Sequence, residues 1–277
     1  DEVINGTTDW VYEEEFGLRD AFRWSPDGKS IAYWQLNTTG VGKFPLVNNT
    51  DSLYPTVTWF AYPKVGQRNS SCRIGVVDCG SAETRWIDVP GDPRDHYLPR
   101  MMYVPPTDSD SQEHRLLIQQ LNRLQNTNRL YVADQDRVAP VLTETDDAWV
   151  DLHDELFWSK DGRHFTWLSD RDGWRHVYVA SLEGGEARLV TPGAFDVVEL
   201  LHVDELNECV YFIASPDTAT ERFLYRARLD GIDLVRVTPA GPAATHQYNI
   251  SPNGKWAIHT RSSADQPPIV DLVSLPD

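Results

Sequence analysis

The chain has 277 residues, of which 40% are hydrophobic, and its formal net charge is −17 at pH 7. A chain of this length and composition can bury a substantial core. Its acidity argues against nucleic acids and anionic membranes as partners, because phosphate binding needs clustered Lys and Arg. The 10 Trp, 11 Tyr and 9 Phe beside only 2 Met indicate a β-rich fold.

The three cysteines, Cys72, Cys79 and Cys209, show neither C-x-x-C spacing nor His partners at zinc-ligand spacing. We therefore expect free thiols, no metal site and no cofactor. The sequence contains no run of 18 apolar residues and begins at Asp1 without a start Met, so we expect no membrane span, no signal peptide and a chain trimmed at both ends. The compartment stays open, because the bacterial periplasm, secretion and the cytoplasm all fit this sequence.

The first predicted element is the acidic stretch 9–16, with the sequence DWVYEEEF, in which three consecutive carboxylates lie between aromatic residues. Trp10, Tyr12 and Phe16 are expected to pack, which would hold the glutamates in place. Carboxylates that are held in place can bind a cation. The alternative is an acidic first turn of a short helix, with Asp9 as its N-cap, that is stabilised by the helix dipole and has no further role.

A polar turn that leads into an alternating strand then recurs along the chain. Its copies are WSPDGKSIAY at 24–33, WSKDGRHFTW at 158–167 and ISPNGKWAIH at 250–259. A weaker copy occupies 202–213. In each full copy, Asp or Asn followed by Gly supplies the positive φ that a two-residue hairpin requires.

A second strand phrase follows the copies, and its tyrosines Tyr131, Tyr178 and Tyr225 are 47 residues apart. Units of 40 to 50 residues with four short antiparallel strands are typical of β-propeller blades. We therefore predict an all-β propeller with about five four-stranded blades and one short helical turn at the Glu motif. The predicted blade boundaries are roughly 18–90, 91–147, 148–193, 194–241 and 242–277.

Two segments depart from this period. Leu117, Leu121 and Leu124 have helical spacing, but the register of the repeat predicts a strand over 115–124. Residues 37–72 lengthen the first unit by an extra hairpin or a long excursion, and insertions of this kind usually lie on one functional face.

No motif for nucleophilic catalysis is present, since the sequence contains no G-x-S-x-G, P-loop or G-x-G-x-x-G, and the histidines are expected to be structural. Residues 170–174 resemble a calcium loop only slightly and fit a hairpin turn better. A glycosidase with paired carboxylates is an alternative, with Asp151, Asp154 and Glu155 as candidates. We predict no catalytic residue and no metal ligand.

Five segments taken together resemble the dipeptidyl-peptidase IV branch of the prolyl oligopeptidase serine peptidases, in order along nearly the whole chain. These segments are 9–15, 24–28, 95–97, 121–126 and 169–178. The resemblance implies an N-terminal eight-bladed propeller and a C-terminal α/β-hydrolase domain, which together release N-terminal dipeptides ending in Pro or Ala.

The resemblance also assigns binding of the substrate's terminal ammonium to Glu14 and Glu15, with Asp9, Trp10 and Tyr12 supporting the motif. This assignment is chemically sensible, because an exopeptidase must measure distance from the amine of its substrate. Two neighbouring carboxylates repel each other, and a bound cation relieves that repulsion.

Compared with the family's layout, the sequence contains neither the first blades, with the Arg that holds the substrate carbonyl, nor the hydrolase domain. We therefore expect a non-catalytic propeller portion of a peptidase. It would bind peptide N-termini, gate access to the active site, partner the hydrolase domain of the same chain and belong to a parent that forms a homodimer. The competing interpretation is a self-sufficient binding propeller that keeps the Glu motif as scaffold.

Overall fold

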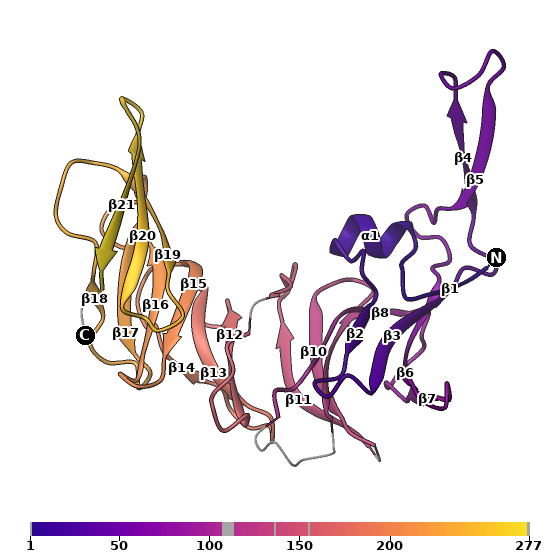
Figure 1. Ribbon diagram of the computed structural model, residues 1–277, viewed down its shortest axis with the longest axis horizontal. Coiled ribbons are helices and arrows are strands. Elements are labelled where there is room, and N and C mark those ends of the chain that lie inside the picture. Colours follow the sequence, from indigo (N-terminus) through magenta and orange to yellow (C-terminus); the bar gives the residue numbers. More distant parts are fainter. Residues whose placement is uncertain (1, 107–113, 136, 155, 276–277) are drawn as a thin grey trace. The chain divides into compact units, whose positions relative to one another are not determined.

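The computed structural model describes residues 2–106, 114–135, 137–154 and 156–275 (Figure 1). They form two compact units, Asp1–Val150 (unit one) and Asp151–Asp277 (unit two). Nearly all regular structure is β, and α1 (Trp10–Phe16) is the one helix among the described residues. The prediction of an all-β chain with a short helix at the Glu motif is confirmed. No helix in the described ranges is long and apolar enough to cross a bilayer.

Unit one contains a five-stranded sheet and a four-stranded sheet. The five-stranded sheet consists of β1 (Val3–Asn5), β2 (Phe22–Trp24), β3 (Ser30–Asn37), β6 (Ser71–Asp78) and β7 (Thr84–Ile87). Strand β3 pairs with β6 along one edge, and β1 and β2 share its other edge. The four-stranded sheet is a meander of β8 (His96–Tyr103), β9 (Leu116–Asn122), β10 (Thr127–Ala133) and β11 (Val138–Thr145).

The lengthened first repeat, residues 18–90, contains an extra hairpin, as the sequence predicted. Its strands are β4 (Lys43–Asn48) and β5 (Thr56–Ala61), which pair antiparallel and project from the rest of unit one (Figure 1). The leucine-spaced segment is extended, also as predicted, because it forms β9. Leu117 and Leu121 are buried in that strand, whereas Leu124 lies in the following turn with 73% of its surface exposed.

Unit two consists of three antiparallel meanders. The first has β12 (His164–Ser169), β13 (His176–Ser181) and β14 (Arg188–Leu189). The second has β15 (Val197–Asp204), β16 (Cys209–Ala214), β17 (Phe223–Arg228) and β18 (Val235–Arg236). The third has β19 (Thr245–Ile250), β20 (Trp256–Ser263) and β21 (Gln266–Ser274).

The outermost pairing of the first meander is reduced to one isolated bridge, between Trp158 and Phe165. Beside it, the Phe157 N–H donates to Thr166 Oγ1 at 3.0 Å, and the Thr166 N–H donates to the Phe157 carbonyl at 2.9 Å. A side-chain hydroxyl therefore replaces one backbone hydrogen bond of the strand ladder. This explains why this sheet has three strands and not the four that the repeat predicts.

Each of the three full copies of the repeated turn forms the same hydrogen-bond network. In each copy a Ser hydroxyl accepts the N–H five residues later, and the Asp or Asn two residues after that Ser accepts the Ser hydroxyl and a further N–H. The pairs are Ser25 with Asp27, Ser159 with Asp161, and Ser251 with Asn253.

The repeated turn is longer than the two-residue hairpin that we predicted, since β2 ends at Trp24 and β3 begins at Ser30. Only the glycine of the turn has positive φ in the first copy, with Gly28 at 69°. The side-chain bonds of Ser25 and Asp27 close this longer loop in place of a primed turn.

The evenly spaced tyrosines occupy equivalent places in three sheets. Tyr131, Tyr178 and Tyr225 are buried, and each lies in an inner strand opposite a residue of the preceding strand. The 47-residue spacing therefore reflects one strand position repeated in successive sheets.

Strand β16 shows how neighbouring sheets of unit two pack. All six of its residues are buried. Val210 and Phe212 belong to the cluster shared with the β12–β14 sheet, whereas Tyr211 and Ile213 belong to the cluster shared with β19–β21. Alternate side chains thus fill the interface on each face, which is how propeller blades stack.

A buried histidine pair in unit two gives a prediction about acid stability. His246 Nδ1 lies 2.8 Å from His259 Nε2, and the two rings are stacked. One of the two nitrogens must donate and the other must accept, so a proton added to the accepting nitrogen would break the contact. Burial and the neighbouring His259 lower the pKa of His246 to about 4, and burial lowers the pKa of His259. Arg236 and Arg261 also oppose protonation of His246, whereas Asp271 favours it at His259.

Because an unperturbed imidazole titrates near 6.5, the unfolded chain takes up protons at a higher pH than the folded chain. The pair therefore contributes its full stability above about pH 6.5, and this contribution falls as the pH drops towards 4. Urea denaturation between pH 7 and 4 should show a steeper loss for wild type than for His246→Gln. His164→Gln is the control. Because His164 is exposed, this variant should lose stability with falling pH as steeply as wild type does. Equal slopes for wild type and His246→Gln would contradict this assignment.

Candidate functional site

The acidic stretch folds into α1, whose ends are both capped. Asp9 is the N-cap, as predicted: its Oδ1 accepts the Tyr12 N–H at 3.1 Å, and its Oδ2 accepts the Ser70 hydroxyl at 2.5 Å. Gly17 caps the other end with φ at 62°, where the Leu18 N–H bonds to the Tyr12 carbonyl at 3.0 Å. Since Asp9 is itself buried, the helix start is fixed to unit one and does not fray in solvent.

One side of α1 packs into unit one. Tyr12 and Phe16 are four residues apart, are both buried, and both contact the ring of Tyr97. Trp10 also packs, but against a residue at the surface and not in the core, because 36% of its surface stays exposed. Trp10 is the first residue of the helix, on its rim, and it contacts Tyr62 at a ring-centroid distance of 4.1 Å.

Strand β8 anchors the helix through the peptide groups of Leu98. The register of β8 against β9 shifts between Tyr97 and Arg100, which leaves Leu98 out of the ladder, so these groups need other partners. The Leu98 N–H donates to Tyr12 Oη at 3.0 Å, and its carbonyl accepts from Trp34 Nε1 at 2.7 Å. Arg100 adds a bond from Nη1 to the Phe16 carbonyl at 2.8 Å. Burial raises the pKa of Tyr12 above its ordinary value, so its hydroxyl stays neutral.

The opposite side of α1 carries the three glutamates, all exposed. At about 100° per residue, Glu14 points away from the buried side, and Glu13 and Glu15 flank it. Glu13 forms an ion pair with Arg19, Nε to Oε1 at 3.4 Å. Glu15 Oε1 accepts the side-chain amide of Gln125 at 2.8 Å. Within the described ranges, no ion pair involves Glu14 or Glu15, so their negative charges remain uncompensated.

The helix itself does not favour these two charges. Glu14 and Glu15 lie in the second half of a seven-residue helix that has no basic residue in its last turn. Negative charge near a helix C-terminus opposes the helix dipole. A cation bound to these two neighbouring carboxylates would offset their unfavourable interaction with the helix dipole and their repulsion of each other.

The unfavourable position of the Glu14 charge near the helix C-terminus predicts that Glu14→Gln stabilises the fold. Removing the charge should raise the free energy of unfolding by about 0.3–1 kcal/mol, the usual size of a helix-dipole effect. Thermal denaturation would measure it as a small rise in Tm. Glu13→Gln is the matched control, because it breaks the ion pair with Arg19 and should bring no such rise. A clear fall in Tm for Glu14→Gln would show that the carboxylate supports the fold.

The other candidate residues belong to segments other than α1. Asp151 and Asp154 are exposed in an irregular segment of unit two, and Glu155 lies outside the described residues. In the 170–174 turn, Asp172 Oδ2 lies 2.9 Å from His176 Nδ1. The described part of the chain contains no group of three or more His, Cys, Asp or Glu that could hold a metal. The thiols of Cys72, Cys79 and Cys209 are free.

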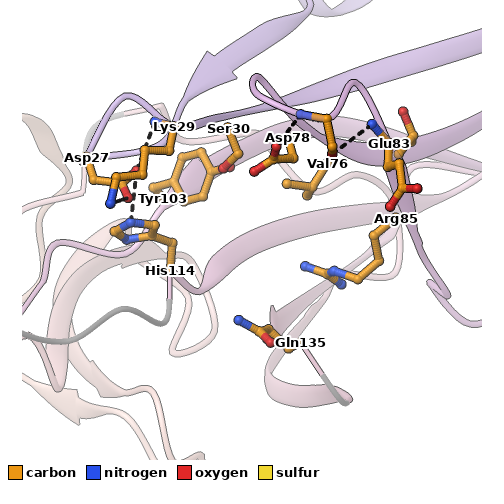
Figure 2. A pocket seen from close by; sticks show the side chains of 12 residues that line it. Asp27, Lys29, Ser30, Val76, Asp78, Glu83, Arg85, Tyr103, His114 and Gln135 are labelled. Atoms are coloured by element: carbon orange, nitrogen blue, oxygen red, sulfur yellow. Dashed lines mark hydrogen bonds and ion pairs between the residues drawn. The ribbon is translucent and has the colours of Figure 1, made fainter.

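Unit one also contains a pocket of about 520 Å³, lined by the β2–β3 turn, the β6–β7 hairpin and the end of β8 (Figure 2). Two of its carboxylates, Asp27 and Asp78, accept hydrogen bonds from their own turns. Asp27 accepts bonds from Ser25 and the Lys29 N–H, which hold the pKa of that carboxyl below its usual range, and His114 Nε2 lies 3.2 Å away. None of the residues of α1 lines this pocket, so we do not connect it with the two glutamates.

Sequence reasoning missed several residues that position α1. Ser70, Trp34 and Arg100 contact it or its anchor across 61, 64 and 84 positions of the sequence, and no local pattern marks them. Gln125 carried a signal, since it belongs to the 121–126 segment of the resemblance, but its contact with Glu15 was not foreseen.

Among solved structures, dipeptidyl peptidase 4 of Porphyromonas gingivalis matches with a TM-score of 0.85 and 28% identity, covering 99% of this chain and 38% of that one. A putative dipeptidyl aminopeptidase IV of Bacteroides ovatus has the same fold, with a TM-score of 0.80 at 21% identity, covering 99% of this chain and 40% of that one.

Curated relatives show the same correspondence. Probable dipeptidyl peptidase 4 of Trichophyton verrucosum is 29% identical over 269 residues, which are 93% of this chain and 35% of that protein. Dipeptidyl peptidase 4 of Trichophyton rubrum is also 29% identical, over 93% of this chain and 34% of its own length. The chain thus spans about a third of the length of these relatives. A family model described as the dipeptidyl peptidase IV (DPP IV) N-terminal region matches residues 1–268, and the chain belongs to this family.

Proposed function

We propose that this region supplies the amine-binding end of the active site in a serine dipeptidyl peptidase. The full-length protein would release dipeptides with Pro or Ala in second position from free N-termini. Family membership supports the class of protein, and one observation carries the site: Glu14 and Glu15 project from a helix whose other side is anchored in unit one.

The chemistry of an ammonium group fits this pair. An ammonium has a positive charge and three N–H donors, and each carboxylate offers acceptor oxygens. Hydrogen bonds between charged partners are stronger than neutral ones. Both carboxylates carry uncompensated charge, and the helix that bears them is tied down at Asp9, Tyr12 and Phe16. An anchored pair of this kind can fix the position of a substrate's N-terminus.

Glu13 has a different role in this proposal. Its charge is already paired with Arg19, and it lies on the far flank of the helix from Glu15. We therefore assign the ammonium to Glu14 and Glu15 and leave Glu13 as a surface residue.

The remaining parts of the enzyme belong to the same proposal. A hydrolase domain of the same full-length chain would supply the nucleophile, its base and the oxyanion hole. The propeller would gate access to it, and the full-length protein would form a homodimer.

The direct test uses the full-length protein and two peptides that share an Ala-Pro start, one with a free amine and one N-acetylated. Mass spectrometry should detect release of the dipeptide from the free-amine peptide only. The 277-residue chain alone should release nothing above buffer background. Equal cleavage of the acetylated peptide would refute an amine-binding site, and binding of the free-amine peptide without cleavage would instead support a binding module.

A further inference from the structure

We infer that Gln125 is a positioning residue for the amine site: its side-chain amide holds the carboxylate of Glu15 in the orientation that receives the ammonium. This inference rests on the proposed function. The contact joins Gln125 Nε2 and Glu15 Oε1 at 2.8 Å, across 110 positions of the sequence and between the four-stranded sheet and α1.

The chemical character of the donor separates Glu15 from Glu13. Arg19 brings a positive charge to Glu13, so that carboxylate is already paired. Gln125 brings a neutral N–H to Glu15, so it restrains the carboxylate without cancelling its charge. The bond occupies one acceptor direction of Oε1 and leaves Oε2 for another donor. A negative group that is held but not neutralised is what a cationic ligand needs.

The backbone at Gln125 is built to present this side chain. Its φ is 55°, a left-handed conformation that residues other than Gly rarely adopt. Asn122 holds the turn: its Oδ1 accepts the N–H groups of Asn126 and Thr127, each at 3.1 Å, and its carbonyl accepts the Gln125 N–H at 3.0 Å. On the other side, the Gln125 carbonyl accepts the Val150 N–H at 2.9 Å.

This turn would be easier to form with glycine at position 125, because glycine has no Cβ to strain a positive φ. The long amide side chain is therefore kept at a conformational cost. Its described side-chain contact is the one to Glu15. A strained position that delivers a donor to a candidate binding group points to function.

The experiment measures kcat and KM of the full-length protein for a dipeptide amide with a free amine and for its N-acetylated form. Gln125→Met keeps the length of the side chain and removes the donor. Gln125→Gly removes the donor and relieves the backbone. Leu124→Ala is the matched control in the same turn, since Leu124 is 73% exposed. Each change is also made together with Glu15→Gln, and Tm is recorded for every variant.

We expect Gln125→Met and Gln125→Gly to lower kcat/KM for the free-amine substrate by about three- to tenfold. The loss should come from a higher KM, and kcat should change little. The Tm of Gln125→Gly should not fall, and Leu124→Ala should match wild type. In the Glu15→Gln background the Gln125 changes should cost little more, because both act through one carboxylate.

Two results would overturn the inference while leaving the proposed function intact. One is a silent Gln125→Gly alongside an impaired Glu15→Gln. The other is an equal loss from Gln125→Gly in the wild-type and Glu15→Gln backgrounds. A silent Glu15→Gln together with a silent Glu14→Gln would instead reject the amine site itself, and the inference with it.

Discussion

Replacing Glu14 or Glu15 by Gln in the full-length protein should lower kcat/KM about ten- to a hundredfold for a dipeptide amide with a free amine. The change keeps the size of the side chain and its hydrogen-bonding capacity but removes one negative charge. A charge-assisted hydrogen bond is worth roughly 1.5–3 kcal/mol, and about 1.4 kcal/mol corresponds to a factor of ten in rate. Steady-state kinetics on purified variants would measure the loss.

The loss should depend on the charge of the substrate. An N-acetylated amide presents no ammonium, so its poor turnover should be nearly the same in wild type and in both variants. Glu13→Gln is the control within the same helix. Glu13 is exposed and paired with Arg19, so its change should cost less than about threefold, in line with weak surface ion pairs. Wild-type kcat/KM in Glu14→Gln and Glu15→Gln would show that the acidic stretch is only a capped helical turn.

Stability should move in the opposite direction to activity at Glu14. The same substitution that weakens ammonium binding removes a charge that opposes the helix dipole. A variant that is slightly more stable but much less active is the pattern expected where a protein retains an unfavourable group for function. A purely structural role for Glu14 would lower both quantities together.

The features that sequence predicted well are local ones. Ser25, Asp27 and Gly28 form their turn from bonds within six residues, so the pattern of Ser, Asp or Asn, and Gly gives the same structure at 159–162 and 251–254. The N-cap of α1 is equally local, since Asp9 and Tyr12 are three residues apart. The evenly spaced tyrosines identified the repeat because each one occupies the same place in an inner strand.

The features that sequence missed depend on contacts between distant segments. The sequence predicts that Trp10 packs, but not that it does so on the exposed rim of the helix, against Tyr62 of a distant segment. The bond from Gln125 to Glu15 joins residues 110 positions apart, and no periodicity marks such a pair. The resemblance was enough to name the two glutamates, but it could not show which contacts hold them in place.

The anchor of α1 leads to the largest expected effect on stability. The N–H and carbonyl of Leu98 lie at an irregularity between β8 and β9, and the side chains of Tyr12 and Trp34 satisfy them in the interior of unit one. Tyr12→Phe would leave the buried N–H without its acceptor, and Trp34→Phe would leave the carbonyl without its indole donor. An unsatisfied buried group costs about 1–3 kcal/mol, and the smaller ring at position 34 adds a cavity cost.

Chemical denaturation should therefore show a loss of about 1–3 kcal/mol for Tyr12→Phe and a larger loss for Trp34→Phe. Tyr33→Phe is the matched control, because its hydroxyl makes only a long, partly buried contact of 3.4 Å with Thr84, and its removal should cost far less. Tyr12→Phe should also raise KM for the free-amine substrate, because the bond that it removes ties the Glu-bearing helix to β8. If Tyr12→Phe is as stable as the Tyr33→Phe control, the Leu98 N–H has found another acceptor, and the anchoring of Glu14 and Glu15 must come from Asp9 and Arg100 alone.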